Sequence, residues 1–286
     1  MNEMPLVSVV TLTRNRGKLI GRCIESILNQ TYTNIEHIVI DGASDDETDD
    51  VISSISDNRL RFIKLDYNWP FEKSLKYGTS LAKGDYICFL DSDDEYLPTK
   101  IEKQLSLIQS LPDEYGMVYC WMTFLDSSNN NAVIRLHQPK LKGYVPLEAA
   151  EKPTVSGTPT FFFKKKIYDE LGGWNWEMPI VTDFELGARY CQKYKVDYVP
   201  ESLVNAYENH YYVRATDKIN KQKEWASKRV AMHQYMLDEF KNLFDEHPRH
   251  RAHHLNRIVI YSIKGGDYFN ALKYTFIYLK AKILGL

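Results

Sequence analysis

Residues 82–94 read AKGDYICFLDSDD, a run of apolar residues that stops abruptly at acidic ones. The apolar part, residues 86–90, predicts a strand buried on both faces. Three carboxylates follow it, at Asp91, Asp93 and Asp94. Carboxylates this close repel one another unless a cation or solvent offsets their charge, and oxygen ligands suit Mg²⁺ or Mn²⁺. The run therefore predicts either a divalent-metal site or a solvated acidic turn that caps the next helix.

The residues before this run alternate between strand and helix patterns. Residues 7–12 and 35–40 are typical of buried strands, and residues 19–28 between them carry an apolar stripe at helical spacing. A further helix is predicted over residues 71–82, with Gly84 as its C-cap. Repeated β-α-β units predict a doubly wound, mainly parallel sheet that binds ligands at the carboxyl ends of its strands.

After residue 112 the pattern changes. A long strand pattern comes first, shorter ones follow, and helical spacing dominates the last quarter of the chain. The predicted strands are residues 116–125, 133–137, 161–164 and 196–199. The predicted helices are residues 167–171, 182–194 and the segment from 218 to the end, with breaks near Pro248 and Gly265.

Composition excludes several protein classes. The chain has 286 residues, 44% hydrophobic and 26% charged, with a formal net charge of −2, so nucleic acid is not an expected partner. Its four cysteines lie far apart without a C-x-x-C pair, which favours buried free thiols in a reducing compartment. The sequence shows no signal-peptide pattern and no uncharged apolar stretch of ~18 residues. The expected location is cytoplasmic, at most peripheral at the inner face of a membrane.

Glycine-rich nucleotide-binding motifs are missing. Residues 11–15, TLTRN, follow the first strand where a dinucleotide enzyme carries G-x-G-x-x-G, and no G-x-x-x-x-G-K-[ST] occurs. Any phosphates would therefore be bound through a metal and side chains. Asp41 ends the second predicted strand and is expected to open onto the same ligand crevice as Asp91.

Four blocks, in the same order along the chain, resemble the family-2 glycosyltransferases. They are PLVSVVTLTRN at residues 5–15, ILNQTY at 27–32 with VIDGASD at 39–45, the block at 82–94, and GGW at 172–174 followed by TDFE at 182–185. The block at 82–94 matches the pattern A-x-G-[DE]-Y-I-x-F-L-D-S-D-D, which carries the D-x-D motif of that family.

The resemblance implies the GT-A fold, a Rossmann-like α/β architecture with a mixed, mainly parallel sheet, flanking helices and here a helical C-terminal tail. It implies a catalytic domain over residues 1–215, with a nucleotide-binding half at 1–112 and an acceptor half at 113–215, and a helical extension at 216–286. The implied reaction moves a sugar from a nucleotide-diphospho-sugar, with UDP favoured, to a hydroxyl of a glycan or lipid-linked acceptor. It is metal-dependent, inverts the anomeric carbon, and is typical of polysaccharide and cell-envelope assembly.

The resemblance also assigns roles to single residues. The nucleotide-binding residues are Thr11, Thr13, Arg14, Asn15, Asp41, Lys76, Asp91 and Ser92. Among these, Asp41 accepts a hydrogen bond from the nucleobase and Asp91 reaches the ribose. Asp93, together with His210, holds the Mn²⁺ or Mg²⁺ that bridges the diphosphate. Asp183 is the general base that deprotonates the acceptor hydroxyl.

The chain departs from the family pattern at two places. Lys76 stands where relatives carry Asn, and it either contacts the diphosphate or is a solvated lysine on a helix. The residue before Asp183 is Thr182 rather than the common Glu, and Glu185 is a fallback base.

Three further residues have two interpretations each. His210 and Arg214 either close over the donor as part of a loop or are a surface histidine and a salt-bridged arginine. Trp174, where the family places Phe, either stacks on an acceptor or donor sugar or packs in the core.

The end of the chain carries a basic amphipathic pattern. Its apolar stripe consists of Phe269, Leu272, Phe276, Leu279 and Ile283, at helical spacing. Lys273 and Lys280 flank the stripe. Such a helix suits peripheral contact with an anionic membrane, and it equally suits packing on the catalytic domain or on a second subunit in a homodimer.

Two other functions compete with glycosyl transfer. A non-catalytic relative that binds a sugar nucleotide or carbohydrate is disfavoured by the intact Asp41, Asp91, Asp93 and Asp183. A sugar-nucleotide pyrophosphorylase would need a glycine-rich loop after the first strand, and residues 11–17 do not supply it.

Overall fold

The computed structural model describes residues 4–155, 157–175, 177, 180–212 and 222–284. The chain forms two compact units, each assembled from several segments. The sheet unit consists of Met1–Tyr144, Ser156–Trp174 and Tyr194–Tyr212. The helical unit consists of Val145–Val155, Asn175–Lys193 and Val213–Leu286. This grouping differs from a single boundary at residue 215, because the segment that carries Asp183 belongs to the helical unit.

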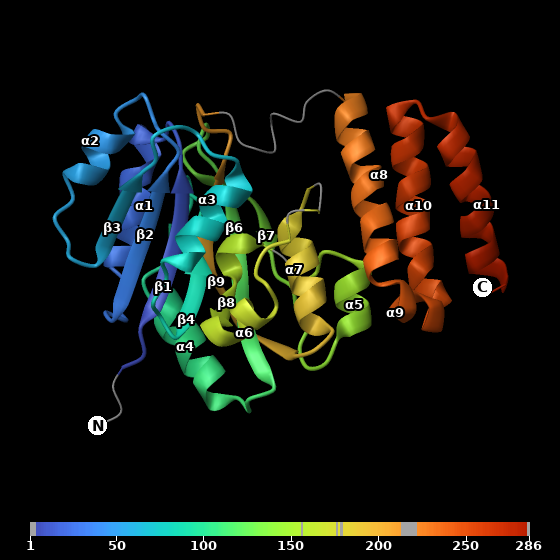
Figure 1. The fold of residues 1–286 in the computed structure, drawn as a ribbon, viewed down its shortest axis with the longest axis horizontal. Coiled ribbons are helices and arrows are strands. Elements are labelled where there is room, and N and C mark those ends of the chain that lie inside the picture. The colour runs from blue at the N-terminus through green and yellow to red at the C-terminus, as the bar shows by residue number, and fades with distance from the viewer. Residues whose placement is uncertain (1–3, 156, 176, 178–179, 213–221, 285–286) are drawn as a thin grey trace. The chain divides into compact units, whose positions relative to one another are not determined.

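The sheet unit is built on one nine-stranded mixed sheet (Figure 1). Its spatial order is β3 (Leu60–Lys64), β2 (Ile35–Asp41), β1 (Val7–Thr13), β4 (Tyr86–Phe89), β8 (Phe162–Lys164), β6 (Tyr115–Asp126), β9 (Lys195–Glu208) and β5 (Glu95–Tyr96), with β7 (Ala132–His137) paired to β6. β3, β2, β1 and β4 are parallel, as are β6 and β9, whereas β8, β7 and β5 run antiparallel to their partners. The predicted mixed, mostly parallel sheet is confirmed.

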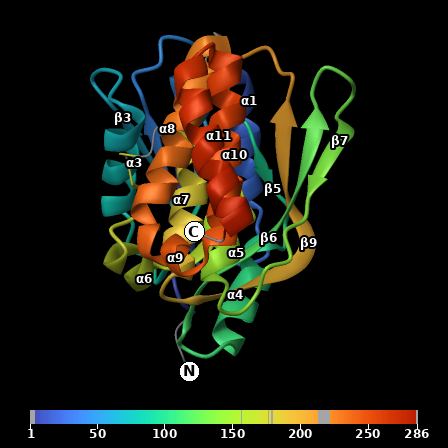
Figure 2. The same cartoon turned by 90° about the vertical axis from the view of Figure 1, so that its right-hand side faces the viewer.

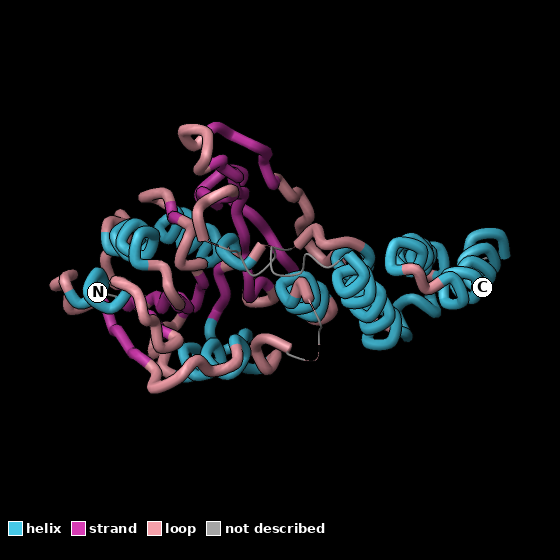
Figure 3. The backbone as a smooth tube through the Cα atoms, turned by 90° about the horizontal axis from the view of Figure 1, so that it is seen from above, coloured by secondary structure: helices cyan, strands magenta, loops and turns pink. Residues whose placement is uncertain are grey.

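Helices cover both faces of this sheet (Figure 3). On one face Val7 and Val9 of β1 form a core with apolar residues of α1 (Gly17–Leu28) and α4 (Lys100–Ser110). On the other face Ile38 and Ile40 of β2 pack with Leu65 and with Tyr77 of α3 (Phe71–Ser80). The remaining helices of this unit are α2 (Thr48–Ser53), the 3₁₀ turn η1 (Thr158–Thr160) and α6 (Lys165–Glu170).

β9 is far longer than the four-residue strand predicted at 196–199. It continues through Pro200, and its pairing with β6 slips there, because Cys120 pairs with Val199 and Trp121 with Ser202. Proline has no N–H to donate, so it fits only where the ladder is already irregular. Figure 2 shows the long β6 and β9 side by side with the β7 hairpin. The length of β9 brings the residues after Glu208 close to the turn that follows β4, because β5 pairs with β9 near its end.

Gly84 does not cap a helix. α3 ends at Ser80, and Gly84 lies where the chain passes β1 at close range. A Cβ atom at this position would lie 2.7 Å from the backbone of Leu6 and Ser8. The N–H of Gly84 donates to the Ser8 hydroxyl at 2.8 Å. The glycine is therefore required by close packing rather than by a left-handed helix end.

The helical unit contains α5 (Pro146–Glu151), α7 (Thr182–Cys191), α8 (Gln222–Glu239), α9 (Lys241–Glu246), α10 (Pro248–Gly265) and α11 (Tyr268–Leu284). α10 packs against both α8 and α11 (Figures 1 and 2). The predicted breaks are present, since Pro248 starts α10 and Gly266 caps it with φ 78°. A further break at Phe240 was not predicted. Within the described part of the chain, every helix is too short or too polar to cross a membrane.

Candidate active site

The carboxyl ends of β1, β2 and β4 meet at the point where the sheet changes its winding direction. β2 and β3 lie on one side of β1, and β4 lies on the other. In open α/β sheets ligands bind outside the strand ends at this switch point. We call these strand ends and the loops that follow them the strand-end site. Of the residues that the sequence singled out, it holds Thr13, Arg14, Asn15, Asp41, Asp91, Ser92 and Asp93.

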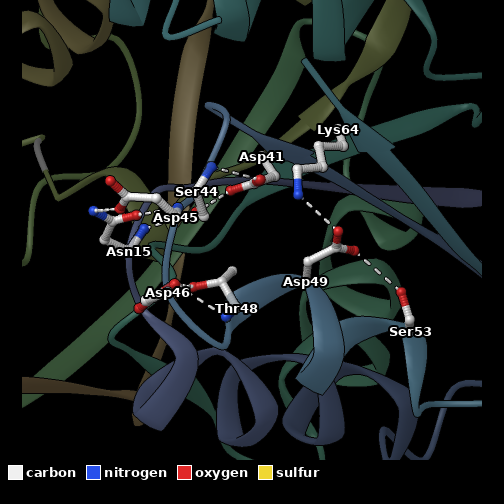
Figure 4. A network of polar contacts seen from close by, with 9 residues as sticks. All are labelled: Asn15, Asp41, Ser44, Asp45, Asp46, Thr48, Asp49, Ser53 and Lys64. Carbon is white, nitrogen blue, oxygen red and sulfur yellow. Dashed lines mark hydrogen bonds and ion pairs between the residues drawn. The ribbon is translucent and has the colours of Figure 1, made fainter. Parts of the chain in front are cut away.

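Asp41 closes the loop that follows β2 (Figure 4). Its side chain has no exposed surface. The Ser44 N–H donates to Asp41 Oδ2 at 2.9 Å, and the Ser44 hydroxyl donates to Oδ1. A nucleobase would therefore have to share this buried carboxylate with Ser44 or displace it. In this structure the task of Asp41 is to hold the loop.

Reciprocal hydrogen bonds join the loops after β1 and β2 (Figure 4). The Asn15 side chain donates to Asp45 Oδ1 at 2.7 Å, and the Asp45 N–H donates to Asn15 Oδ1 at 3.1 Å. The Asn15 N–H also donates to Ser44 Oγ at 2.8 Å. Asn15 has φ 51°, a left-handed conformation that Asn adopts more readily than most residues. The two loops therefore form one rigid rim.

The two threonines of β1 differ in whether their hydroxyl groups already have a hydrogen-bond partner. Thr11 is fully buried and its hydroxyl lies 2.9 Å from His37 Nε2, so it supports the strand from within the core. Thr13, at the end of β1, is 5% exposed, and its hydroxyl has no hydrogen-bond partner among the described residues. Arg14 follows with an exposed side chain. Thr13 and Arg14 are thus the polar groups of this segment that remain available to a ligand.

The acidic turn after β4 divides its carboxylates between two tasks. Asp94 is 2% exposed and accepts the Tyr207 N–H of β9 at 3.1 Å, so it ties the turn to the sheet. Asp91 is exposed, whereas Ser92 and Asp93 are buried. The turn is therefore more than a solvated acidic loop.

Asp93 pairs with His210, which lies 117 residues further along the chain. His210 Nε2 is 2.9 Å from Asp93 Oδ2, and the imidazole is only 4% exposed. Nδ1 of His210 is buried with no partner in the part of the chain that is described. The long β9 delivers this histidine from the opposite end of the sheet unit's sequence.

The Asp93–His210 pair fits a divalent cation. A carboxylate and an imidazole are ligands that Mn²⁺ accepts, and Mg²⁺ is usually held by one or two protein carboxylates while substrate phosphates complete its shell. Among the described residues no group of three or more His, Cys, Asp or Glu side chains is arranged to hold a metal by itself. The pair therefore suits a cation that arrives with a phosphate-bearing ligand.

Arg22 of α1 is a site residue that the sequence did not indicate. Its guanidinium donates to the backbone oxygen of Asp93 at 2.7 Å and lies 3.5 Å from the ring centre of Tyr207. Burial and a hydrogen bond to Glu95 raise the pKa of Tyr207 to about 12, so the phenol stays neutral beside the cation. Arg22 fixes the acidic turn, and no local pattern marks it because its partners are distant in the chain.

Lys76 is exposed to solvent, whereas Trp174 is buried. Lys76 is exposed on α3. Trp174 is 6% exposed and packs edge-on against Phe89 of β4, with ring centres 5.4 Å apart. Of the two interpretations of Trp174, the structure therefore favours packing in the core.

Asp183 and Glu185 occupy the first turn of α7 in the helical unit and differ sharply. Glu185 has no exposed surface, and both of its oxygens accept from Arg189, at 2.7 and 2.9 Å. Asp183 is half-buried. The i,i+4 spacing of Glu185 and Arg189 was the sequence signal for this ion pair. A carboxylate held in this way has no free oxygen to accept a proton from a substrate.

Arg214 lies outside the described residues.

Comparisons with known proteins agree with the fold and the motifs. The family model described as "Glycosyl transferase family 2" matches residues 8–172. An uncharacterized glycosyltransferase of Methanocaldococcus jannaschii is 30% identical over 71% of this chain and 70% of its own length. A UDP-Glc:alpha-D-GlcNAc-diphosphoundecaprenol beta-1,3-glucosyltransferase, WfaP of Escherichia coli, is 40% identical over 37% of this chain and 43% of its own length. An uncharacterized glycosyltransferase of Rickettsia typhi is 35% identical over 44% and 39%. The match thus spans less than half of the latter two relatives.

Solved structures share the fold at low sequence identity. TarS 1–349 of S. aureus, whose structure in complex with UDP-GlcNAc is known, has a TM-score of 0.61 at 16% identity, covering 98% of this chain and 90% of that one. The mannosyltransferase PcManGT of Pyrobaculum calidifontis, in complex with GDP-Man and Mn²⁺, has a TM-score of 0.59 at 17% identity, covering 98% and 81%. These neighbours have the GT-A fold.

Proposed function

The chain belongs to glycosyl transferase family 2, and we propose that it moves a sugar from a nucleotide-diphospho-sugar to a hydroxyl of a glycan or lipid-linked acceptor. The observation that carries this proposal is the Asp93–His210 pair at the switch point of the sheet. The complexes of its structural neighbours with UDP-GlcNAc and with GDP-Man and Mn²⁺ support a nucleotide-sugar donor. The name of the E. coli relative supports a lipid-linked acceptor.

The donor's nucleoside would lie against the strand-end site. Thr13 offers an unpartnered hydroxyl, Arg14 an exposed cation and Asp91 an exposed carboxylate for the ribose. Asn15 and Asp41 would shape this pocket through the loop contacts that they hold, and a uracil N3–H would have to share Asp41 with Ser44 or displace it. Ser92 is buried between Asp91 and Asp93 in the acidic turn. The exposed Lys76 is a candidate to bind the donor diphosphate.

Asp93 and His210 would hold Mn²⁺ or Mg²⁺ together with the donor diphosphate. When bound, the ion neutralises the charge that develops on the departing nucleoside diphosphate. Arg22 keeps the Asp93 backbone in place, and Asp94 anchors the same turn to β9. The chain's own contribution is therefore a turn held by contacts to α1 and β9, which presents one carboxylate beside one imidazole.

Asp183 is the proposed general base. It would take the proton of the acceptor hydroxyl as that oxygen attacks the anomeric carbon, and a single displacement of this kind inverts the anomeric configuration. Its half-exposed position supports the choice, because Glu185 two residues further on is sealed against Arg189.

We further propose that α11 rests on an anionic membrane. Tyr274, Ala271 and Ala281 lie on its buried side, while the opposite side exposes an apolar stripe of Phe269 (84% exposed), Leu272 (73%), Phe276 (74%) and Leu279 (45%). The side chain of Ile283 lies outside the described residues.

Charge favours a lipid surface over a second copy of the chain. Lys273, Lys280 and Lys282 are exposed on α11, and Tyr268–Leu284 contains no acidic residue. Two copies joined through this stripe would bring lysines together without a carboxylate on the helix to offset them. An anionic bilayer instead attracts each lysine by about 1 kcal/mol.

Binding and turnover separate the proposal from its alternatives. We expect UDP-sugars or GDP-mannose to raise the unfolding temperature of the full chain only when Mn²⁺ or Mg²⁺ is present. A ligand at a hundredfold excess over its Kd stabilises the fold by about 2.7 kcal/mol. Release of nucleoside diphosphate with a glycan or lipid-linked acceptor identifies the enzyme. Stabilisation without release for any acceptor tested would favour a non-catalytic binder, and no stabilisation by any nucleotide sugar would refute the proposal.

A further inference from the structure

The helical unit contains a partly open cavity of about 350 Å³. α7, α8, α10 and the segment after α5 form its walls, so it shares no residue with the strand-end site. Apolar side chains such as Phe184, Met232 and Tyr261 make up much of the lining. A volume of this size is in the range of small-molecule sites.

The polar side chains of this cavity are predominantly basic. Lys152, Arg229, His233, His253 and Arg257 line it, and no Asp or Glu lines it among the described residues. Glu151, next to Lys152 in the chain, is already engaged by His250 at 2.8 Å and by the ammonium group of Lys152 at 3.5 Å. The wall therefore carries more positive charge than the protein itself neutralises.

Its two arginines lack carboxylate partners within the described ranges. Arg229 lies over the Trp225 ring at 5.1 Å, and its Nε is buried without a hydrogen-bond partner there. Arg257 lies over the Tyr261 ring and donates to the Tyr261 hydroxyl. By contrast, Arg189 of the same unit is held by both oxygens of Glu185. Guanidinium groups without a carboxylate partner beside a cavity indicate an anionic ligand that supplies the missing acceptors.

A histidine pair defines one further ligand contact. His254 Nε2 lies 2.9 Å from the Ala150 carbonyl oxygen, which can only accept, so the proton is on Nε2. Burial lowers the pKa of His254 to about 4, and its Nδ1 therefore accepts from His233 Nδ1–H at 2.9 Å. This leaves Nε2 of His233 as an acceptor. A phosphate monoester, with a second pKa near 6, supplies negative charge and, in its monoanionic form, an O–H for such an atom, whereas sulfate and carboxylate at neutral pH supply no O–H.

Val181, at the start of α7, also lines the cavity and has φ 59°. A β-branched residue in the left-handed region is strained, and such strain gathers at ligand sites. We propose that this cavity binds a phosphate ester, with the phosphate between Arg229 and Arg257 and the organic group against Phe184 and Met232. This inference does not rest on the proposed transferase activity.

Phenyl phosphate is a suitable soluble probe, and dihexanoyl phosphatidic acid below its micelle concentration tests a lipid source of the same group. We expect at least one of them to shift the ring resonances of His233, assigned with His233→Gln, and to bind at least about tenfold more tightly than phenyl sulfate. Binding of phenyl phosphate alone indicates that the natural ligand is a soluble phosphate ester. Preference for dihexanoyl phosphatidic acid indicates a lipid phosphate.

Matched variants decide whether the arginines form the site. Arg229→Gln and Arg257→Gln should each weaken probe binding at least about tenfold. Arg251→Gln, on the same helix α10 but paired with Asp245 at 3.6 Å, should change it less than twofold. Without probe, the two cavity variants should unfold at the same or a higher temperature than the parent, because they remove uncompensated charge. Equal affinity in all variants, lower unfolding temperatures with an unchanged probe effect, or no binding of either probe would overturn the proposal.

Discussion

Asp93 and His210 stand 117 residues apart in the chain and 2.9 Å apart in space, whereas Asp94, beside Asp93, serves the fold. The same contrast separates Asp183 from Glu185 in α7. At the scale of single residues, Asp94 and Glu185 serve the fold through the partners that hold their oxygens. We expect Asp93, beside an imidazole, and the half-buried Asp183 to act on a ligand.

Removing the Asp93 carboxylate tests the metal assignment. We expect Asp93→Ala to abolish metal-dependent donor binding and to lower transfer by at least ~10²-fold, because the variant lacks the carboxylate that would hold the cation. His210→Gln should weaken metal dependence as well. The measurements are calorimetric titration of donor with Mn²⁺ and rates of nucleotide release. Asp113→Asn, at an exposed carboxylate in a loose ion pair, serves as the control. Wild-type activity that survives EDTA would contradict the assignment.

Two amide substitutions in α7 should affect different properties, one lowering turnover and the other lowering stability. Asp183→Asn removes a proton acceptor, so kcat should fall by ~10²–10⁴-fold while donor affinity and unfolding temperature stay nearly unchanged. Glu185→Gln instead leaves Arg189 without its buried partner and should cost roughly 3 kcal/mol of stability. Steady-state kinetics and urea unfolding on both variants give the comparison. A loss of turnover at normal stability in Glu185→Gln, with Asp183→Asn active, would reassign the base.

At the scale of elements, α11 is apolar on two sides. One side packs within the helical unit through Tyr274 and Ala281, and the other exposes Phe276 and Leu272. A helix that needs one apolar face to fold has no structural use for a second. The exposed apolar stripe of α11 is therefore the part of this helix that we expect to contact a partner.

Vesicle sedimentation tests this surface of α11. The double variant Leu272→Ser/Phe276→Ser should lose at least ~100-fold in affinity for vesicles rich in phosphatidylglycerol, because each buried side chain contributes about 1.5–3 kcal/mol. Its stability should change by less than ~0.5 kcal/mol, since both side chains are mostly exposed.

A matched control for that experiment is Leu136→Ser, at an apolar residue of β7 that is 52% exposed. It should sediment like the parent chain. High salt should release the parent, because part of the attraction is between lysines and anionic lipid. Equal sedimentation of parent and double variant, or a parent that forms dimers through α11 and ignores vesicles, would refute membrane contact.

At the scale of the whole molecule, buried histidines tie stability to pH. Burial lowers the pKa of His37 to about 3, and burial also lowers the pKa values of His233 and His254. In the unfolded chain each would titrate near 6.5, so the unfolded state binds more protons below that pH. The stabilisation is complete above pH 6.5 and is lost as the pH falls toward the folded values.

Urea unfolding between pH 7.5 and 4.5 measures this loss. Each of the three histidines contributes up to about 1.4 kcal/mol per pH unit below 6.5. A free energy of unfolding that stays constant down to pH 5 would contradict the prediction.

The parallel half of the sheet was predictable because its signals are local. Residues 7–12, 35–40 and 86–90 are mostly apolar, and the helices between them carry stripes at helical spacing. The extent of β9 was missed because Pro200 interrupts the local pattern, and only pairing with β6 across a bulge sustains the strand. Gly84 was misjudged because the atoms that exclude a side chain there belong to β1, far away in the sequence.

The sequence by itself determined the family, the mostly parallel sheet and the acidic turn after β4. Each of these depends on short stretches of consecutive residues, and such stretches can be recognised without knowing which segments meet in space. Only the tertiary structure decided which polar groups are free. It placed His210 on Asp93, buried Thr11 against His37 and sealed Glu185 with Arg189. It also assembled the basic cavity from four separate segments. Burial and pairing are properties of neighbours in space, and distant segments become neighbours only when the chain folds.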